Sequence, residues 1–469
     1  LILQTSRITK GNIGMSKNLS HNLSRRQFLK IGGAAVASIS LLAACVPAGQ
    51  QPAASSGEAA APGTEAVQLV WDTFRGPGTG WNEERIDTFK AEHPNVEIEF
   101  RPLTGASQQD NYGKMYALFA AGDLGDICAF DPSHFHFWRA INGGIIGPLD
   151  DLIASDNLDQ SQWFEQFIGL QVFQGKQYGL PSWGWAGQDT MVINALHFEQ
   201  EGVELPDPVG HDTSMETYGE WARKFYKEGE RFGLGITYDE GHLVTATRAF
   251  NGDLIDAEGT KSLLLEDENA QAALRWIYDL AVTDKVLPST TDLENKDSAS
   301  LEGKLTMNWG GSLNVRNFKR DIKDEAVAKA SQGLLPTRTD GKAPSQIRGG
   351  TWNILKDSAH PQEAFQFLKH ITSTDGCYGF NLVAGQGAFV RPDVLDKLIE
   401  QDPVHEWFIP NLQNGIPAHA PANSRGREYT DACAQWATLL FDANQPVEFE
   451  KGLQDLHDNI QAVLDLEPA

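Results

Sequence analysis

The chain has 469 residues and a formal net charge of −25 at pH 7, with 63 Asp and Glu against 38 Lys and Arg residues. Nucleic acids and anionic membrane surfaces repel such an acidic chain, so neither is expected as a partner. The length after the N-terminal segments suits one large or two medium domains. Four cysteines without a Cys-x-x-Cys pair indicate neither a full disulfide framework nor a thiolate metal site.

A targeting pattern lies at residues 24–45, SRRQFLKIGGAAVASISLLAAC. The pair Arg25-Arg26 is followed by a Gly- and Ala-rich apolar run that is too short to span a bilayer as a stable helix. Small residues then precede Cys45. The pattern resembles a twin-arginine export signal ending in a bacterial lipobox, which implies cleavage before Cys45 and lipidation of its thiol.

Residues 1–44 are therefore expected to be the export signal, with residues 1–14 as an extension ahead of Met15. Residues 45–65 are mostly Ala, Pro, Gly, Ser and Gln, which cannot bury enough surface to offset the entropy of ordering. We expect a flexible linker here. The mature protein would be anchored to the outer face of the cell membrane by Cys45, in a periplasmic or extracellular location.

The body opens with alternating strands and helices. The expected order is a strand at 68–71, a helix with Glu83 and Glu84 in its first turn that stops ahead of Pro94, a strand at 95–100, a helix closed by Gly122 and a strand at 126–130. Strands that alternate with helices favour an α/β fold with a mainly parallel sheet.

Residues 141–149 contain three glycines and Pro148, and are expected to cross between lobes.

Helical patterns dominate the second half of the chain. Residues 213–216 form a capping box that starts a helix with a stripe of Tyr218, Trp221 and neighbouring apolar residues. Similar stripes predict helices near 273–280 and 453–463.

Several short motifs follow one another along the body. They are FKAEHP at 89–94, LFAAGD at 118–123, NGG at 142–144, PLDD at 148–151, GKQYGLP at 175–181, LEGKLTMNWG at 301–310, LLP at 334–336, GG at 349–350 and KDSAHPQEAFQFL at 356–368. In this order they resemble the solute-binding proteins of carbohydrate ABC importers, the maltose-binding-protein-like family. Gly125-Asp126 and Ile193-Asn194 depart from that family's usual Pro-Asp and Tyr-Asn.

The resemblance implies an α/β, two-lobe fold of the periplasmic-binding-protein type, with several hinge crossings and a ligand cleft between the lobes. On this pattern lobe 1 comprises residues 66–148 and 349–386. Lobe 2 comprises residues 149–348 and 387–469. The partners implied are a carbohydrate ligand and the permease subunits of an ABC transporter, and a monomer without a cofactor is expected.

A sugar site needs flat aromatic rings and planar hydrogen-bonding groups. The candidate ligand-binding residues are Arg75, Asp131, Trp183, Trp185, Trp309, Gly350, Trp352 and Tyr429. The four tryptophans fall in apparent loops or next to glycines, whereas Arg75 and Asp131 follow strands, where open α/β sheets present ligand contacts. Tyr429 is placed by the resemblance alone. Ordinary packing for the tryptophans and a loop salt bridge for Arg75 and Asp131 are the alternatives.

Two functions remain open at this point. The first is a binding protein without catalysis, which closes its lobes around a saccharide and delivers it to a permease. The second is an exported polysaccharide-active enzyme such as a glycoside hydrolase, which would need two carboxyl groups across a cleft. A polyol, phosphodiester or peptide is a further alternative for the ligand. The ordered motifs favour the binding protein.

Three smaller points concern His and Cys residues. His134 and His136 lack a third ligand nearby, so surface or packing roles are expected rather than a metal site. Cys128 is expected to be a small buried hydrophobic residue. A bridge between Cys377 and Cys433 stays open.

Overall fold

The computed structural model describes most of the chain from residue 66 onward. The described residues are 66–75, 80–133, 135–187, 190–205, 213–289, 292–293, 296–310, 331–334, 346–384, 390–409, 412, 415–417 and 419–467. The expected export signal, Cys45 and most of the linker lie outside the described residues.

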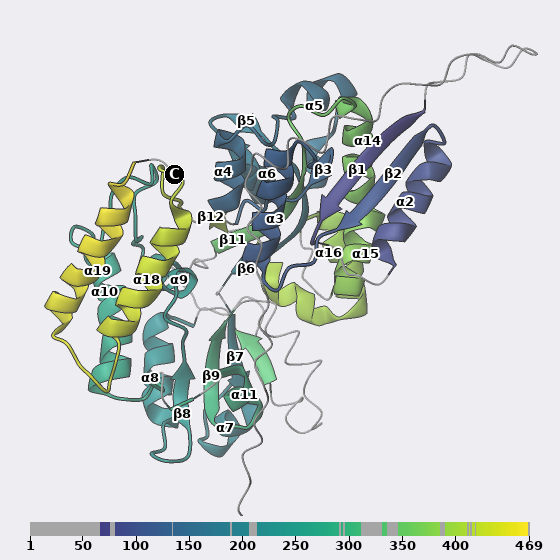
Figure 1. Ribbon diagram of the computed structural model, residues 1–469. Coiled ribbons are helices and arrows are strands. Elements are labelled where there is room, and N and C mark those ends of the chain that lie inside the picture. Colours follow the sequence, from purple (N-terminus) through teal and green to yellow (C-terminus); the bar gives the residue numbers. More distant parts are fainter. Residues whose placement is uncertain are drawn as a thin grey trace, which may run out of the picture. The chain divides into compact units, whose positions relative to one another are not determined.

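The first group of elements surrounds a six-stranded sheet (Figure 1). Its strands are β1 (Val67–Thr73), β2 (Val96–Pro102), β3 (Ile127–Cys128), β6 (Leu180–Gly187), β11 (Gln346–Ile354) and β12 (Ile416–Pro417). Its helices are α2 (Trp81–Glu92), α3 (Gln108–Ala121), α4 (Phe135–Asn142), α5 (Asp150–Asp156), α6 (Glu165–Leu170), α14 (Pro361–Ile371), α15 (Thr374–Ala384) and α16 (Pro392–Gln401). Short elements are η1 (Gln160–Gln162), β4 (Val172–Phe173), β5 (Lys176–Gln177) and η3 (Pro403–Phe408).

This sheet confirms the α/β fold expected from the sequence. Strand β1 pairs in parallel with β2 and β3, as the alternating strands and helices predict. Strand β11 returns from far along the chain and pairs antiparallel with β3 and β6, which makes the sheet mixed. Helices α2 and α14 lie along β1 and β2 (Figure 1).

Local signals set the ends of these helices. Helix α2 carries Glu83 and Glu84 in its first turn, and it ends at Glu92, two residues ahead of Pro94. Acidic side chains there complement the positive end of the helix dipole. Helix α3 ends at Gly122, which adopts φ 72° and donates its N–H to the last turn. This left-handed conformation favours glycine, because a Cβ would strain it.

Two glycines of this region should respond to alanine with opposite signs. Gly122→Ala is expected to lower the free energy of unfolding by about 1 kcal/mol, because the left-handed conformation is retained. Gly113→Ala, inside α3, should raise it by about 0.5–1 kcal/mol. A Cβ would meet no atom within 4 Å at either position, so only the backbone is tested. Urea unfolding measures both, and a change of the same sign in the two variants would contradict this account.

The second group surrounds a four-stranded sheet with the order β10-β7-β9-β8. Its strands are β7 (Thr190–Asn194), β8 (Phe232–Gly235), β9 (Leu305–Gly310) and β10 (Ser331–Leu334). Its helices are α7 (Ala195–Gln200), α8 (Met215–Phe225), α9 (Glu240–Ala249), α10 (Glu268–Tyr278), α11 (Lys296–Leu301), α18 (Gly426–Leu440) and α19 (Phe449–Leu464), with the π-helical turn η2 (Asp279–Thr283).

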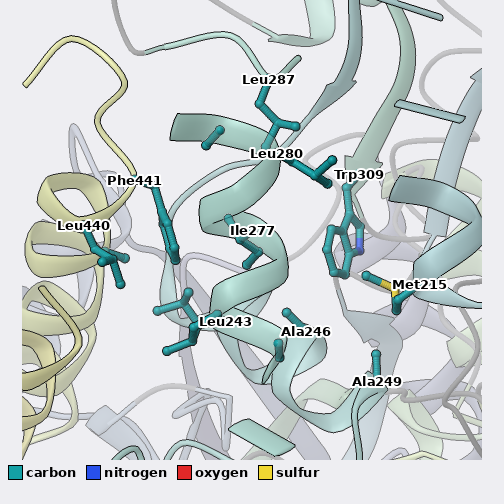
Figure 2. Close-up of a cluster of buried hydrophobic side chains, with 14 of the residues drawn as sticks. Met215, Leu243, Ala246, Ala249, Ile277, Leu280, Leu287, Trp309, Leu440 and Phe441 are labelled. Atoms are coloured by element: carbon teal, nitrogen blue, oxygen red, sulfur yellow. The ribbon is translucent and has the colours of Figure 1, made fainter. Parts of the chain in front are cut away.

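One large core joins these helices to their sheet. Every residue of α9 is buried, and α10 and α18 pack against it. Helix α19 packs on α10 and α18, and α10 and α19 carry the apolar stripes predicted from the sequence. Figure 2 shows part of this core, with Leu243 and Ala246 of α9 facing Ile277 of α10. Helix α8 begins one residue later than the predicted capping box implies, because Ser214 rather than Thr213 is the N-cap and accepts from the Thr217 N–H.

The core of the first group is largely aromatic. The ring of Trp71 on β1 lies 5.1 Å from Trp352, 5.2 Å from Phe100 and 5.2 Å from Phe367, measured between centroids. Tilted and edge-to-face pairs of this kind are the favoured geometries of aromatic rings. This cluster joins strands β1, β2 and β11 to helix α14.

The residues that follow Pro148 do not pack as a lobe boundary at this position would imply. Leu149, Leu180 and Trp183 pack in the same cluster as Trp71, on the first sheet. Ile146 forms a bridge with Leu355, which follows β11. Residues 141–149 therefore lie against the first group instead of crossing away from it, because their apolar side chains complete its core. The exact division into lobes remains a prediction.

The three cysteines of the described residues are buried and free. Cys377 and Cys433 belong to two different core clusters, so the bridge that the sequence left open is not formed. Cys128 lies on β3 and packs with apolar residues, as expected. Burial raises the pKa of the Cys377 thiol to about 12, which leaves it protonated and unreactive.

Candidate ligand site

A cavity of about 520 Å³ lies where helices of the two groups face each other. One side comes from α4, α6 and β4, and the other from the start of α9 and from α18, with β11 and β12 completing the lining. Its apolar lining includes Pro132, Phe135, Trp138, Leu170, Val172, Ile347, Pro417 and Pro421. Its polar lining includes Ser133, Asp239, Glu240, Arg348, His419, Thr430 and Asp431. This volume lies in the usual range of small-molecule sites.

Three charged groups of the cavity, Asp239, Glu240 and Arg348, meet at the start of α9. Arg348 of β11 donates from Nη2 to Oε2 of Glu240 at 2.6 Å, which pairs the guanidinium with a carboxylate. Asp239 caps α9 and accepts from the backbone N–H of His242 at 2.9 Å and contacts its Nδ1 at 2.8 Å. Burial raises the pKa of Asp239, but His242 and Arg348 outweigh it and lower the pKa to about 2. This end of the cavity therefore carries negative charge at neutral pH.

Aromatic side chains from two helices line the cavity. Phe135 and Trp138 come from α4, and Tyr429 comes from the second turn of α18. Helix α18 can begin this close to α4 because of Gly426, where a Cβ would lie 2.6 Å from the Cβ of Phe135. Flat rings near carboxylates and a guanidinium suit a ligand with apolar C–H faces and hydroxyl groups.

Arg75 and Asp131, both proposed from their places after strands, form an ion pair with each other. Oδ2 of Asp131 also accepts from the hydroxyl of Tyr112 at 3.1 Å. The guanidinium of Arg75 lies 4.7 Å from the ring of Phe74 and 5.6 Å from that of Trp183. Burial raises the pKa of Asp131, while Arg75 and Tyr112 act against this shift. Asp131 directly precedes Pro132 of the cavity lining, but neither partner lines the cavity itself.

Trp183, Gly350 and Trp352 lie together in the first core and not on the cavity. Trp183 is on β6 rather than in a loop, and its ring stacks on Phe380 at 5.1 Å. Gly350 is its direct partner on β11, where a Cβ would lie 1.9 Å from the indole. The glycine therefore makes room for the buried indole. Trp352 is wholly buried against Trp71.

The remaining three candidates separate in space. Trp309 is wholly buried in the second core, where Figure 2 shows its indole beside Met215. Trp185 is half-buried at the margin of the first core. Tyr429 lines the cavity, and it is the one candidate residue among the described positions that does so. The candidate ligand site therefore lies among helices α4, α9 and α18 and not around the candidate tryptophans.

Several lining residues were not proposed from the sequence. Asp239 and Glu240 lie at the start of a helix, and Trp138 lies within a short helix. None of them stands in an apparent loop, where the candidate tryptophans were sought. Arg348 directly precedes the Gly349-Gly350 motif, so the motif marks the right strand one position away from the cavity. The position of Arg348 next to this motif is the sequence feature from which it could have been predicted.

His136 has a packing role, as expected, whereas His134 lies outside the described residues. Its Nδ1 lies 3.0 Å from the hydroxyl of Tyr116 and its Nε2 lies 3.0 Å from Oε1 of Gln109. Burial, with Arg139 and Arg427, lowers the pKa of His136 to about 3. Among the residues that the structure describes, no group of His, Cys, Asp and Glu is arranged to hold a metal ion.

His136 should make the fold sensitive to acid. The unfolded chain takes up a proton on this residue near pH 6.5, whereas the folded chain takes it up only near pH 3, so stability is lost as the pH falls between these values. His136→Asn should flatten this loss by up to about 1.4 kcal/mol per pH unit. Urea unfolding from pH 7 to pH 4 tests it, with His360→Gln as the control substitution. Equal slopes for the wild type and His136→Asn would contradict it.

None of the helices in the described part of the chain is both long enough and apolar enough to cross a membrane.

Two α/β groups with a cavity between their helices form a site that can hold a small molecule. The sequence matches the profile of the family described as bacterial extracellular solute-binding protein over residues 71–376. A binding protein of Brucella abortus (strain 2308) is 23% identical over 303 residues, which are 62% of this chain and 68% of that protein. The chain belongs to the family of bacterial extracellular solute-binding proteins, whose members are exported binding proteins.

Solved structures share this fold. An ABC substrate-binding protein of Listeria monocytogenes, in complex with cycloalternan, matches with a TM-score of 0.69 at 17% identity and covers 86% of this chain and 100% of that chain. A Mycobacterium tuberculosis protein in complex with glycerophosphocholine matches with a TM-score of 0.68 at 15% identity, over 85% of this chain and 98% of that chain. At these identities the likeness establishes the fold.

Proposed function

We propose that this protein captures a sugar or oligosaccharide in the cavity between its two groups and delivers it to an ABC permease. The observation that carries the proposal is the cavity lining, which combines Phe135, Trp138 and Tyr429 with the Glu240–Arg348 pair. Rings cover the C–H faces of a sugar, and charged groups bind its hydroxyls. Closure of the two groups around the ligand would bury it and create the surface that a permease recognises.

The charge of the cavity favours a neutral sugar over an anionic ligand. Asp239, Glu240 and Asp431 contribute three carboxylates, whereas Arg348 is the one Lys or Arg among the described lining residues and is already paired. A phosphate or carboxylate ligand would meet repulsion here. The ligands named for the two structural neighbours include both a cyclic oligosaccharide and a phosphodiester. We infer that this chain, like the neighbour in complex with the cyclic oligosaccharide, binds a sugar rather than a phosphodiester.

A thermal-shift screen tests the proposal. The chain is incubated with neutral mono-, di- and oligosaccharides and, separately, with glycerophosphodiesters, and each mixture is then chromatographed. A higher melting temperature with one neutral sugar class and no new product is the expected result. Stabilisation by the phosphodiesters alone would overturn the choice of a sugar. Release of a sugar product that one carboxylate substitution abolishes would establish the alternative, a glycoside hydrolase.

Once a ligand has been identified, two tryptophan variants test whether it binds in the cavity. Trp138→Ala should weaken binding roughly tenfold, because it removes a ring from the cavity. Trp221→Ala is the matched control, since this residue is also partly buried but packs on the second core away from the cavity. Equal affinities of the two variants would place the ligand elsewhere.

We further propose that the protein is a lipoprotein exported by the twin-arginine route. The support is the pattern at residues 24–45 with Arg25-Arg26 and Cys45. Replacing both arginines with lysine should leave the precursor inside the cell. Cys45→Ala should leave the exported protein uncut or released from the membrane fraction. A Cys45→Ala variant that is still cleaved and still found in the membrane fraction would contradict lipidation.

A further inference from the structure

We propose that Arg248 is a positioning residue for the ligand cavity, which it shapes by holding one wall in place. The wall consists of residues 416–417 and 419–422, called the wall segment below. Pro417, His419 and Pro421 of this segment line the cavity. The inference rests on the proposed function in one respect, since it assumes that this cavity receives the ligand.

Arg248 lies in the last turn of α9 and is only 2% exposed. Its Nε donates to Oδ2 of Asp253 at 2.9 Å, which neutralises the buried charge. Its two terminal nitrogens donate to backbone carbonyls of the wall segment, Nη1 to Ile416 at 3.2 Å and Nη2 to Pro417 at 3.0 Å. The guanidinium is therefore a fixed connection between the second core and this segment.

The same two wall residues belong to the first sheet. Ile416 and Pro417 form β12, which pairs in parallel with Gln346 and Ile347 at the start of β11. The carbonyls that Arg248 binds thus come from an edge strand of one group, whereas Arg248 itself is buried with the other. A change in how the two groups sit would therefore strain or break these two hydrogen bonds.

A second contact fixes the far end of the wall segment. The N–H of Ala422 donates to the carbonyl of Gly259 at 2.9 Å. Gly259 has φ +69°, and a Cβ there would lie 1.9 Å from the carbonyl oxygen of Ala420, so glycine is required by both conformation and space. His419 lies between the two anchors, with Nδ1 3.4 Å from Oδ2 of Asp253.

Arginine suits this role better than lysine would. A planar guanidinium can donate to one carboxylate and two carbonyls at once, whereas an ammonium group on a flexible stem cannot hold the same three acceptors in one plane. Arg248→Lys should therefore keep the charge next to Asp253 and release β12. The substitution separates positioning of the wall from pairing with the partly buried carboxylate of Asp253.

Hydrogen exchange of the full-length protein, without ligand, tests this directly. In Arg248→Lys the amides of the wall segment should exchange roughly tenfold faster, because one or two charged hydrogen bonds are lost. Arg231→Lys is the matched control. Arg231 is 4% exposed and also joins a carbonyl, that of Phe225 at 2.9 Å, to a carboxylate, that of Glu201 at 2.7 Å, but it does not line or hold the cavity.

The outcomes are distinct. Faster exchange of the wall segment in Arg248→Lys, with a comparable loss of melting temperature but unchanged wall exchange in Arg231→Lys, supports the proposal. Equal wall exchange in the two variants overturns it. With a sugar from the screen, Arg248→Lys should weaken binding roughly tenfold and Arg231→Lys should not. If the wall loosens but no sugar binds the wild type, the proposed function fails and the positioning role stands.

Discussion

Asp131→Ala is expected to lower the free energy of unfolding by about 3–5 kcal/mol, because it leaves the guanidinium of Arg75 largely buried without its counter-ion. Asp131 is 2% exposed, and the Arg75 side chain is 19% exposed. The substitution also removes the acceptor of the Tyr112 hydroxyl bond to this carboxylate. Urea unfolding followed by tryptophan fluorescence measures the loss.

An exposed ion pair of the same sheet region is the control. Lys90 and Glu97 are 2.6 Å apart with side chains 48% and 58% exposed, so Glu97→Ala should cost less than about 1 kcal/mol. Combining Asp131→Leu with Arg75→Met should recover much of the stability, since neither charge is then buried alone. An Asp131→Ala loss no larger than that of Glu97→Ala would mean that Arg75 reaches water or another partner.

Trp309→Ala should be similarly costly, about 3–5 kcal/mol, because it opens a cavity in the second core. The indole of Trp309 is wholly buried in this core (Figure 2). Its ring centroid lies 6.2 Å from that of Trp276. Its backbone carbonyl also accepts from Lys296 and contacts Nε2 of His242 at 3.1 Å, so relaxation around the gap is restricted. Thermal and urea unfolding both report the effect.

Binding measurements separate this role from the one that the sequence suggested. At a temperature where Trp309→Ala is folded, its affinity for the sugar should equal that of the wild type. Trp185→Ala, at a half-buried position, should cost less stability than Trp309→Ala. A variant that keeps its stability but loses binding would instead place the indole of Trp309 against the ligand.

The sequence predicts those elements whose signals are local. The ends of α2 and α3 follow from Pro94 and Gly122, and the stripes of α8, α10 and α19 follow from helical periodicity. Strand β3 is only two residues long, because Ala129 and Phe130 beyond it pack without a strand partner in the described sheet. Element type was thus predictable, whereas element length depended on tertiary packing.

The site was harder to predict because it depends on pairing between distant segments. Trp183 looked like a loop residue because its strand partner, Gly350, is far away along the chain. Only that register shows that the indole fills the space left by a glycine. Likewise Arg348 meets Glu240 across more than one hundred residues, so no local pattern could bring them together. Tyr429 came from the family resemblance rather than from any local pattern.

The order of segments along the chain has a consequence for synthesis. The second core includes Leu453, Leu456 and Ile460 of α19, and the first includes residues of β11 and α14 that follow most of the second group in sequence. Neither core can therefore be completed while the ribosome is still making the middle of the chain. Such long-range closure slows folding and leaves apolar surface open to chaperones and proteases for longer. Even a short C-terminal truncation should therefore yield a chain that is degraded rather than a smaller working protein.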